Sequence, residues 1–191
     1  MEQVWKELSR LVAEHPVAQA IGMAALVVTC LSYMARETRG IALRQGAANC
    51  LWTAHLLMLG AWTGGLMTLL GAGRDAVYSQ RGIRGWASAR GWPWAFGVLC
   101  VGAAVWAGIA QGEGPKLLLS CGAQCLSCHA LWTANVARAR LLLVLSCALW
   151  LAYDALSGSI PGVLCEAGSL LSLLVVLTKR RKSSPCPMSL A

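Results

Sequence analysis

The chain has 191 residues, of which 57% are hydrophobic and only 13% are charged, and its mean hydropathy is +0.59. So little polar surface excludes a water-soluble globular domain, and we expect an all-α membrane protein that crosses the bilayer several times. The formal net charge of +8 does not indicate nucleic-acid binding, because the basic residues stand in short groups between apolar runs.

The predicted elements begin with residues 1–15, where Val4, Trp5 and Leu8 fall at helical spacing opposite a charged side. This pattern predicts an amphipathic helix that lies in the membrane interface. A spanning helix needs about 20 apolar residues, although about 17 are tolerated. Such segments occur at about residues 17–35, 45–61, 63–79, 92–110, 117–135, 140–157 and 161–178. Residues 183–191 are predicted to form a disordered tail.

Basic residues accumulate in every second connection between these seven segments. The connections after the first, third, fifth and seventh segments contain Arg36, Arg39, Arg44, Arg81, Arg84, Arg90, Arg138, Arg140, Lys179, Arg180, Arg181 and Lys182. The intervening connections contain only Lys116. Because Lys and Arg collect on the cytoplasmic side of short loops, we expect the N-terminus outside and the C-terminus inside. The C-terminal basic cluster is an expected contact for anionic lipid headgroups.

Two parts of the chain repeat each other at an offset of 98 residues. Leu51, Trp52, Ala54, Gly60, Gly64 and Leu66 recur as Leu149, Trp150, Ala152, Gly158, Gly162 and Leu164. Chance would give roughly one or two such identities. Seven segments with this offset divide as three, one and three, since a single linking helix restores the parallel orientation of two three-helix repeats. The predicted domains are a first repeat at 16–85, a linker helix at 86–112 and a second repeat at 113–182.

This 3+1+3 arrangement, with a tryptophan on the second helix of each repeat, resembles the SWEET/SemiSWEET (MtN3, PQ-loop) transporters. The chain more closely resembles the YgjV-type bacterial inner-membrane proteins. That likeness is carried by Tyr33-Met-Ala-Arg36, Gln45, His55, Leu59-Gly60-Ala-Trp-Thr-Gly64, Arg74, Ser157-Gly-Ser-Ile-Pro-Gly162 and Glu166. The resemblance implies a multi-pass protein of the bacterial inner membrane with a SWEET-like fold, and it implies no particular substrate.

Charged residues inside the predicted spans are candidates for a central site, because each costs about 2.5–3.5 kcal/mol on insertion and normally faces the bundle interior. We expect Arg74 to be the main polar anchor, with Glu166 or Asp75 as its counter-charge. The alternative is a buried ion pair that only fixes helix register.

Trp52 and Trp150 occupy matching places in the two repeats. The resemblance to SWEET-type carriers implies that they form aromatic walls of a solute pocket, where His55, Tyr153 and Asn49 would add hydrogen bonds. The alternative is that these tryptophans belong to the interfacial belt or to the packing of the bundle.

The stretch Cys125-Leu-Ser-Cys128-His129 matches the pattern of c-type haem attachment, and Cys121 adds a soft ligand one turn earlier. The motif lies in the middle of a predicted span, whereas haem is attached to exported, unfolded segments. Cysteine is frequent throughout the spans, so packing is the main interpretation, with a thiol, metal or haem protein as the alternative.

These observations favour a small-solute carrier, passive or ion-coupled, and neither an enzyme nor a cofactor protein. The alternative is a non-transporting membrane subunit or scaffold of a larger complex, whose centre would be filled with side chains. A membrane-protein partner or a homo-oligomer fits both hypotheses. The solute is not specified: Arg74 near a central site indicates an anion, and a neutral solute fits equally well if Glu166 pairs with Arg74.

Overall fold

A computed structural model describes Arg10, residues 12–33 and residues 38–182 of the chain. Within these residues the chain forms α-helices and one short 3-10 helix, and no strand. The helices are α2 (Pro16–Tyr33), α3 (Thr38–Met58), α4 (Trp62–Tyr78), η1 (Gly85–Ser88), α5 (Trp92–Gln111), α6 (Lys116–Trp132), α7 (Val136–Leu156) and α8 (Ile160–Lys182). The predicted tail at 183–191 and residues 1–9 and 11 of the predicted interfacial helix lie outside the described residues, whereas Arg10 and residues 12–14 are helical.

Each of the seven predicted apolar segments is helical, but two helices begin earlier than predicted. α3 begins at Thr38 and α7 at Val136, so Arg39, Arg44, Arg138 and Arg140 lie in helices rather than in connections. The Asn135 side chain caps α7 by accepting a hydrogen bond from the Arg138 N–H over 3.0 Å. Arg44 Nη1 reaches the Leu31 carbonyl at 3.1 Å. Helices therefore extend past the apolar runs, because polar residues can cap and solvate their ends.

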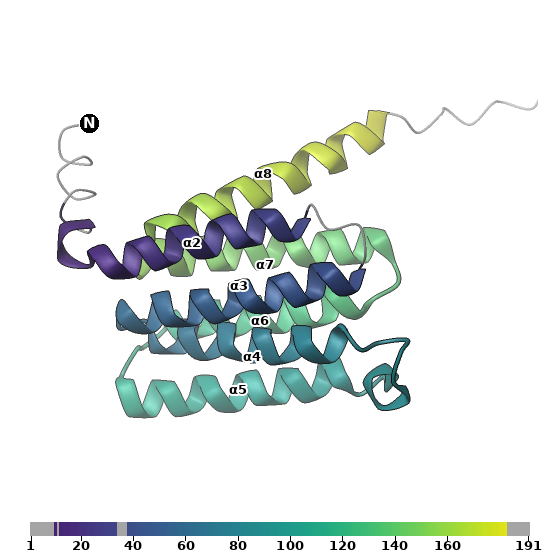
Figure 1. Cartoon of the computed structure of the whole chain (residues 1–191), viewed down its shortest axis with the longest axis horizontal. Coiled ribbons are helices and arrows are strands. Elements are labelled where there is room, and N and C mark those ends of the chain that lie inside the picture. Colours follow the sequence, from purple (N-terminus) through teal and green to yellow (C-terminus); the bar gives the residue numbers. More distant parts are fainter. Residues whose placement is uncertain (1–9, 11, 34–37, 183–191) are drawn as a thin grey trace, which may run out of the picture.

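Two short turns join α3 to α4 and α7 to α8. Gly60 follows α3 with φ +72° and Gly158 follows α7 with φ +70°. Glycine adopts this left-handed conformation without the steric cost of a Cβ, so each helix can end sharply. Both turns lie at the same end of the bundle as the connection between α5 and α6 (Figure 1).

Six helices form a closed ring, and α5 lies outside it. In ring order α2 packs against α3, α3 against α4, α4 against α6, α6 against α7, α7 against α8, and α8 against α2. α5 packs against α4 and α6. Most of the helices run nearly side by side along the long axis of the molecule, with α8 inclined away (Figure 1). The ring brings residues from both halves of the chain around one axis.

The outer surface of the bundle is apolar. Large hydrophobic side chains are exposed on α5, α6 and α8, including Val98 (73% exposed), Ile109 (83%), Leu118 (68%) and Leu171 (65%). Among the described helices, α5 and α7 are long and apolar enough to cross a membrane by themselves. Exposed apolar side chains on this scale suit a lipid surrounding better than water.

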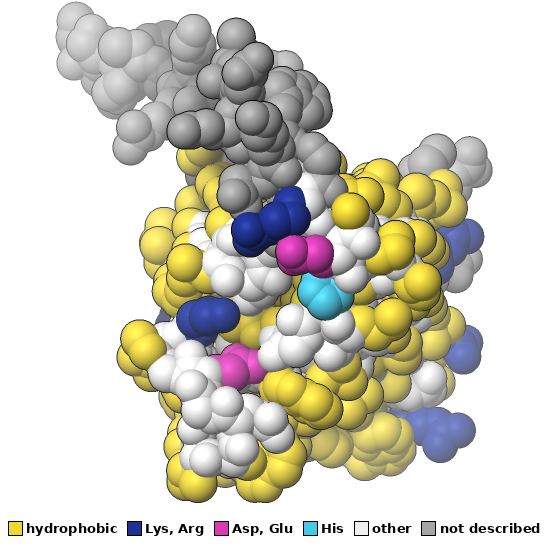
Figure 2. Space-filling view, turned by 90° about the vertical axis from the view of Figure 1, so that its left-hand side faces the viewer, with side chains coloured by type: hydrophobic (Ala, Val, Ile, Leu, Met, Phe, Trp, Pro, Cys, Tyr) yellow, Lys and Arg dark blue, Asp and Glu magenta, His cyan; other side chains and the backbone are white. Residues whose placement is uncertain are grey.

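The two ends of the bundle differ in charge. Arg39, Arg81, Arg90 and Arg138 are exposed at the end where α3, α5 and α7 begin, which we call the basic end (Figure 1). The other end carries the turns at Gly60 and Gly158 and is called the turn end. Figure 2 shows that the turn end carries acidic side chains and a histidine beside its basic ones, among hydrophobic and other uncharged groups. This difference agrees with the alternating charges of the connections.

Candidate functional site: a cavity inside the helix ring

A cavity of about 820 Å³ lies inside the six-helix ring. All six ring helices contribute to its walls, and among the described residues α5 contributes none. Lining residues at the basic end, such as Arg39 and Arg81, are exposed, whereas Leu56, Asp154 and Gly162 near the turn end are buried. The cavity therefore opens at the basic end and is closed at the turn end.

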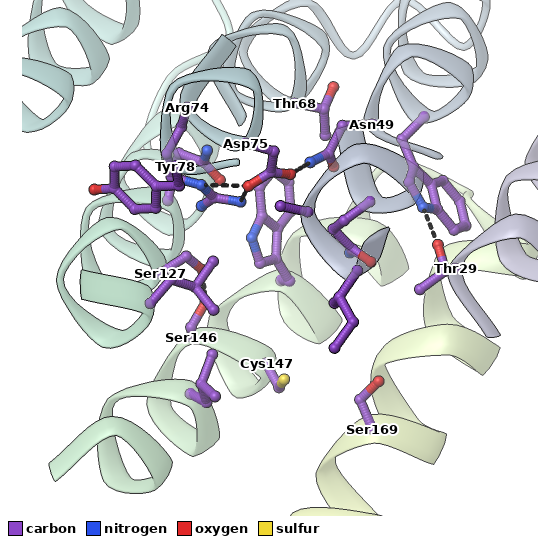
Figure 3. Close-up of a pocket in the computed structure, with 18 of the residues that line it drawn as sticks. Thr29, Asn49, Thr68, Arg74, Asp75, Tyr78, Ser127, Ser146, Cys147 and Ser169 are labelled. Carbon is purple, nitrogen blue, oxygen red and sulfur yellow. Dashed lines mark hydrogen bonds and ion pairs between the residues drawn. The ribbon is translucent and has the colours of Figure 1, made fainter. Parts of the chain in front are cut away.

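A buried ion pair forms part of the wall on α4. Arg74 and Asp75 are 4% and 2% exposed. Arg74 Nη2 lies 2.8 Å from Asp75 Oδ1, and Arg74 Nε donates to the same oxygen over 2.9 Å. Asn49 Nδ2 on α3 donates to Asp75 Oδ2 over 2.8 Å (Figure 3). Of the two predicted counter-charges, Asp75 pairs with Arg74 and Glu166 does not, so this cluster is neutral and ties α3 to α4.

The wall formed by α7 and α8 carries two further acids, Asp154 and Glu166. Asp154 is only 5% exposed, and its carboxyl group has no hydrogen bond or ion pair within the described part of the chain. Glu166 lies beside the thiol of Cys147. Trp150 lines the cavity four residues before Asp154, on the same face of α7. This wall is acidic and aromatic, and Cys147 marks it in Figure 3, across from Asp75.

Hydroxyl and indole groups complete the lining. Trp52 on α3 is 9% exposed, and its Nε1 donates to Thr29 Oγ1 on α2 over 3.2 Å (Figure 3). Ser127 Oγ on α6 lies 2.7 Å from Ser146 Oγ on α7. These contacts hold neighbouring ring helices in register, whereas Arg74 Nη1 and Gln124 Nε2 in the same lining have no hydrogen-bond partner within the described residues.

His55 lies outside the cavity lining, at the closed end. Its Nδ1 is 2.7 Å from the Ala18 carbonyl on α2, and its Nε2 is 2.8 Å from Ser159 Oγ in the turn before α8. Ser159 Oγ in turn accepts the Gly162 N–H of the first turn of α8 over 3.1 Å. His55 therefore joins α2 and α3 to the start of α8.

Tyr153 makes the corresponding contact on the other side of the ring and is also absent from the cavity lining. Its hydroxyl accepts the Gly64 N–H over 2.7 Å. Glu113 accepts the Thr63 N–H over 3.0 Å and also the Thr63 hydroxyl. The first N–H groups of a helix lack intrahelical partners, and Ala61 supplies no side-chain cap to α4. The start of α4 is therefore capped by residues that lie far away in the sequence, and this contact closes the turn end.

The cysteine motif lies between helices rather than on the cavity. Cys121 and Cys125 pack in the apolar core shared by α4, α5 and α6, and Cys128 is fully buried. His129 Nδ1 lies 3.1 Å from the Cys125 carbonyl, and its ring packs against Trp94 at 4.8 Å. Across the described ranges, no three His, Cys, Asp or Glu side chains are placed to hold a metal ion.

The cavity thus brings together most of the predicted site residues. Its lining includes Asn49, Trp52, Arg74, Trp150 and Glu166. Sequence reasoning omitted Asp154 and Gln124 from the site, although both line the cavity. The spacing of Asp154 from Trp150 was a usable signal, because residues four apart share a helix face. Glu113 carries no such signal, since it lies in a connection and its partner is distant in the chain.

A helical bundle with an apolar outer surface and a polar internal cavity defines the class: this chain is a helical membrane protein. Residues 16–184 match the family model described as Imp-YgjV, bacterial inner membrane protein. The chain therefore belongs to the YgjV family and is a protein of the bacterial inner membrane, which confirms the resemblance inferred from the sequence. No curated protein and no solved structure matches the chain. The likeness to SWEET-type carriers stays a prediction.

Proposed function

We propose that this protein is a small-solute carrier of the bacterial inner membrane. The observation that carries the proposal is the cavity of about 820 Å³ between six helices, whose lining residues are exposed at the basic end and buried near the turn end. A carrier needs a central site that is accessible from one side of the membrane at a time. The volume of the cavity lies within the range of small-molecule sites, about 300–1,000 Å³. The protein acts by binding a solute and moving its two halves relative to each other, and not as an enzyme.

In this proposal all seven long helices cross the membrane, with the N-terminus outside and the C-terminus inside. The exposed arginines at the basic end support this orientation, because such residues accumulate on the cytoplasmic side. The cavity then opens to the cytoplasm, and the closed turn end faces outside. In this proposal the conformation described above is the inward-open state of the carrier.

The two halves are parallel three-helix repeats, and α5 is the linker between them. Support comes from the helix bounds, since α3 and α7 each have 21 residues and begin 98 residues apart. His55 and Tyr153 are separated by the same offset, and each contacts the beginning of the third helix of the other repeat. Symmetric contacts of this kind suit two repeats that separate and rejoin at the turn end during transport.

A membrane scaffold is the second candidate. The cluster of Asn49, Arg74 and Asp75 fits it, because a neutral, hydrogen-bonded group can serve only to fix two helices. A scaffold predicts a centre filled with side chains, however, and the cavity opposes that expectation. The carrier is therefore the better hypothesis.

Side-specific labelling of single cysteines tests the proposal. Ser127→Cys and Ser169→Cys, in a cysteine-free background, place thiols on the cavity wall. We expect a membrane-impermeant maleimide to label both from the cytoplasmic side, and added solute to slow the reaction. Ser120→Cys, whose side chain is fully buried on α6, is the matched control and should not react.

Two outcomes would contradict the carrier. If Ser127→Cys and Ser169→Cys resist labelling from both sides as Ser120→Cys does, the centre is sealed and the scaffold is favoured. Labelling from the outside alone would reverse the proposed orientation.

A further inference from the structure

The charged groups on the deep cavity walls fall into two sets with different partners. Arg74 and Asp75 neutralise each other, and Asn49 holds the second carboxylate oxygen of Asp75. Asp75 already supplies the negative charge that an unpaired Arg74 would attract from a solute. Arg74 Nη1 has no hydrogen-bond partner within the described residues, but an anionic solute would meet a neutral ion pair there rather than an uncompensated charge.

Asp154 and Glu166 form the second set, and they have no cationic partner among the described residues. The Asp154 side chain is more than nine-tenths buried and unbonded, and the two carboxyl groups lie close enough to act on each other's charge. The titratable groups that face them are Cys147 and Cys165. On the far wall the Arg74 charge is taken by Asp75. Two carboxyl groups in a poorly solvated site either hold a proton or, when charged, are stabilised by a positive partner.

The surroundings favour an organic cation over a metal ion. A metal ion needs several ligands in a tight shell, and no three suitable side chains are so placed in the described ranges. Trp150 lies on the same face of α7 as Asp154, and Trp52 also lines the cavity. Indole rings attract cations and bury apolar groups. The cavity is large enough for a molecule with both features.

We propose that the cavity binds solutes that carry an ammonium or amidinium group, which Asp154 and Glu166 hold while Trp150 contacts the apolar part. This inference rests on the proposed carrier function and names its substrate class. Arg39 and Arg81 line only the mouth, where their side chains are exposed and solvent screens their charge.

Three small probes that share a phenethyl group and differ in charge test the inference on the purified full-length protein. Phenethylamine is cationic, N-acetylphenethylamine is neutral and 3-phenylpropionate is anionic. We expect phenethylamine alone to raise the melting temperature and to give a saturable titration by calorimetry. The neutral analogue controls for partition of an aromatic molecule into the detergent.

Two carboxyl variants and one control identify the site. Asp154→Asn and Glu166→Gln should each weaken phenethylamine binding by about tenfold or more, as expected for loss of a charged contact. Glu14→Gln changes an exposed carboxyl group that pairs with Arg10 outside the cavity, and it should leave the affinity unchanged. The wild-type comparison of the three probes remains decisive if either cavity variant fails to fold.

Several results would overturn the inference. Equal binding of the neutral or anionic probe, unchanged affinity in both carboxyl variants, or no binding of any probe would each do so. The melting temperature of the wild type could depend on pH while no amine binds. If Asp154→Asn abolished that pH dependence, the carboxyl groups would carry a proton instead of an organic cation. Labelling of Ser127→Cys and Ser169→Cys tests the carrier separately, so a carrier of another solute class would still be recognised.

Discussion

Asp75 on one wall of the cavity and Asp154 and Glu166 on the other are bonded in different ways. Asp75 receives an ion pair from Arg74 and a hydrogen bond from Asn49. Asp154 receives neither, and Glu166 has only a thiol beside it. Removal of a paired buried acid leaves its partner without a counter-charge and costs stability, whereas removal of an unpaired one relieves a desolvation cost. Substitutions in the two sets should therefore change stability in opposite directions.

The largest effect is expected from Asp75→Asn. This change leaves the Arg74 guanidinium buried without its counter-charge, which should lower the free energy of unfolding by about 3–5 kcal/mol. Denaturant unfolding of the purified protein in detergent would measure it. The double variant Arg74→Gln with Asp75→Asn removes both charges and should recover part of the loss. A loss of well under about 1 kcal/mol for Asp75→Asn would show that cavity water already compensates Arg74.

A smaller loss is expected from Asn49→Ala, which removes the hydrogen bond to Asp75 Oδ2. An unsatisfied buried charged acceptor costs about 1–3 kcal/mol. The measurement is a double-mutant cycle with Asp75→Asn. We expect the effect of Asn49→Ala to shrink in the Asp75→Asn background, since the charged acceptor has gone. Strict additivity of the two losses would mean that Asn49 acts through other contacts.

The smallest effect, opposite in sign, is expected on the second wall. Asp154→Asn or Glu166→Gln removes an unpaired carboxyl group and should raise the free energy of unfolding by about 0.5–2 kcal/mol in the absence of solute. Glu14→Gln is the control and should stay within about 0.5 kcal/mol of the wild type. If either cavity variant loses stability instead, its carboxyl group holds the bundle together and the contrast between the walls fails.

The positions of the helices followed closely from the sequence. Apolar runs of sufficient length predicted all seven segments, because a chain in lipid must satisfy its backbone groups internally. The early beginnings of α3 and α7 could not be read from hydropathy. Their first turns contain Arg39 and Arg138, and such polar turns form where capping and long side chains solvate a helix end.

The candidate site was only partly predictable. Charged and aromatic residues within apolar runs indicated Arg74, Trp52 and Trp150, all of which line the cavity. His55 and Tyr153 share those helices, yet they point to the closure at the turn end. A residue's place on its own helix does not reveal which neighbouring helix it meets.

Composition and the placement of apolar and basic residues were enough to predict a helical membrane protein, and the family match assigns it to the bacterial inner membrane. These properties depend on each segment and its solvent, so they can be read locally. The partner of Arg74, the closure by His55, Tyr153 and Glu113, and the unpaired state of Asp154 emerged from the folded bundle. Each depends on which helices become neighbours in the ring, and that is a property of side-chain packing between segments far apart in the chain.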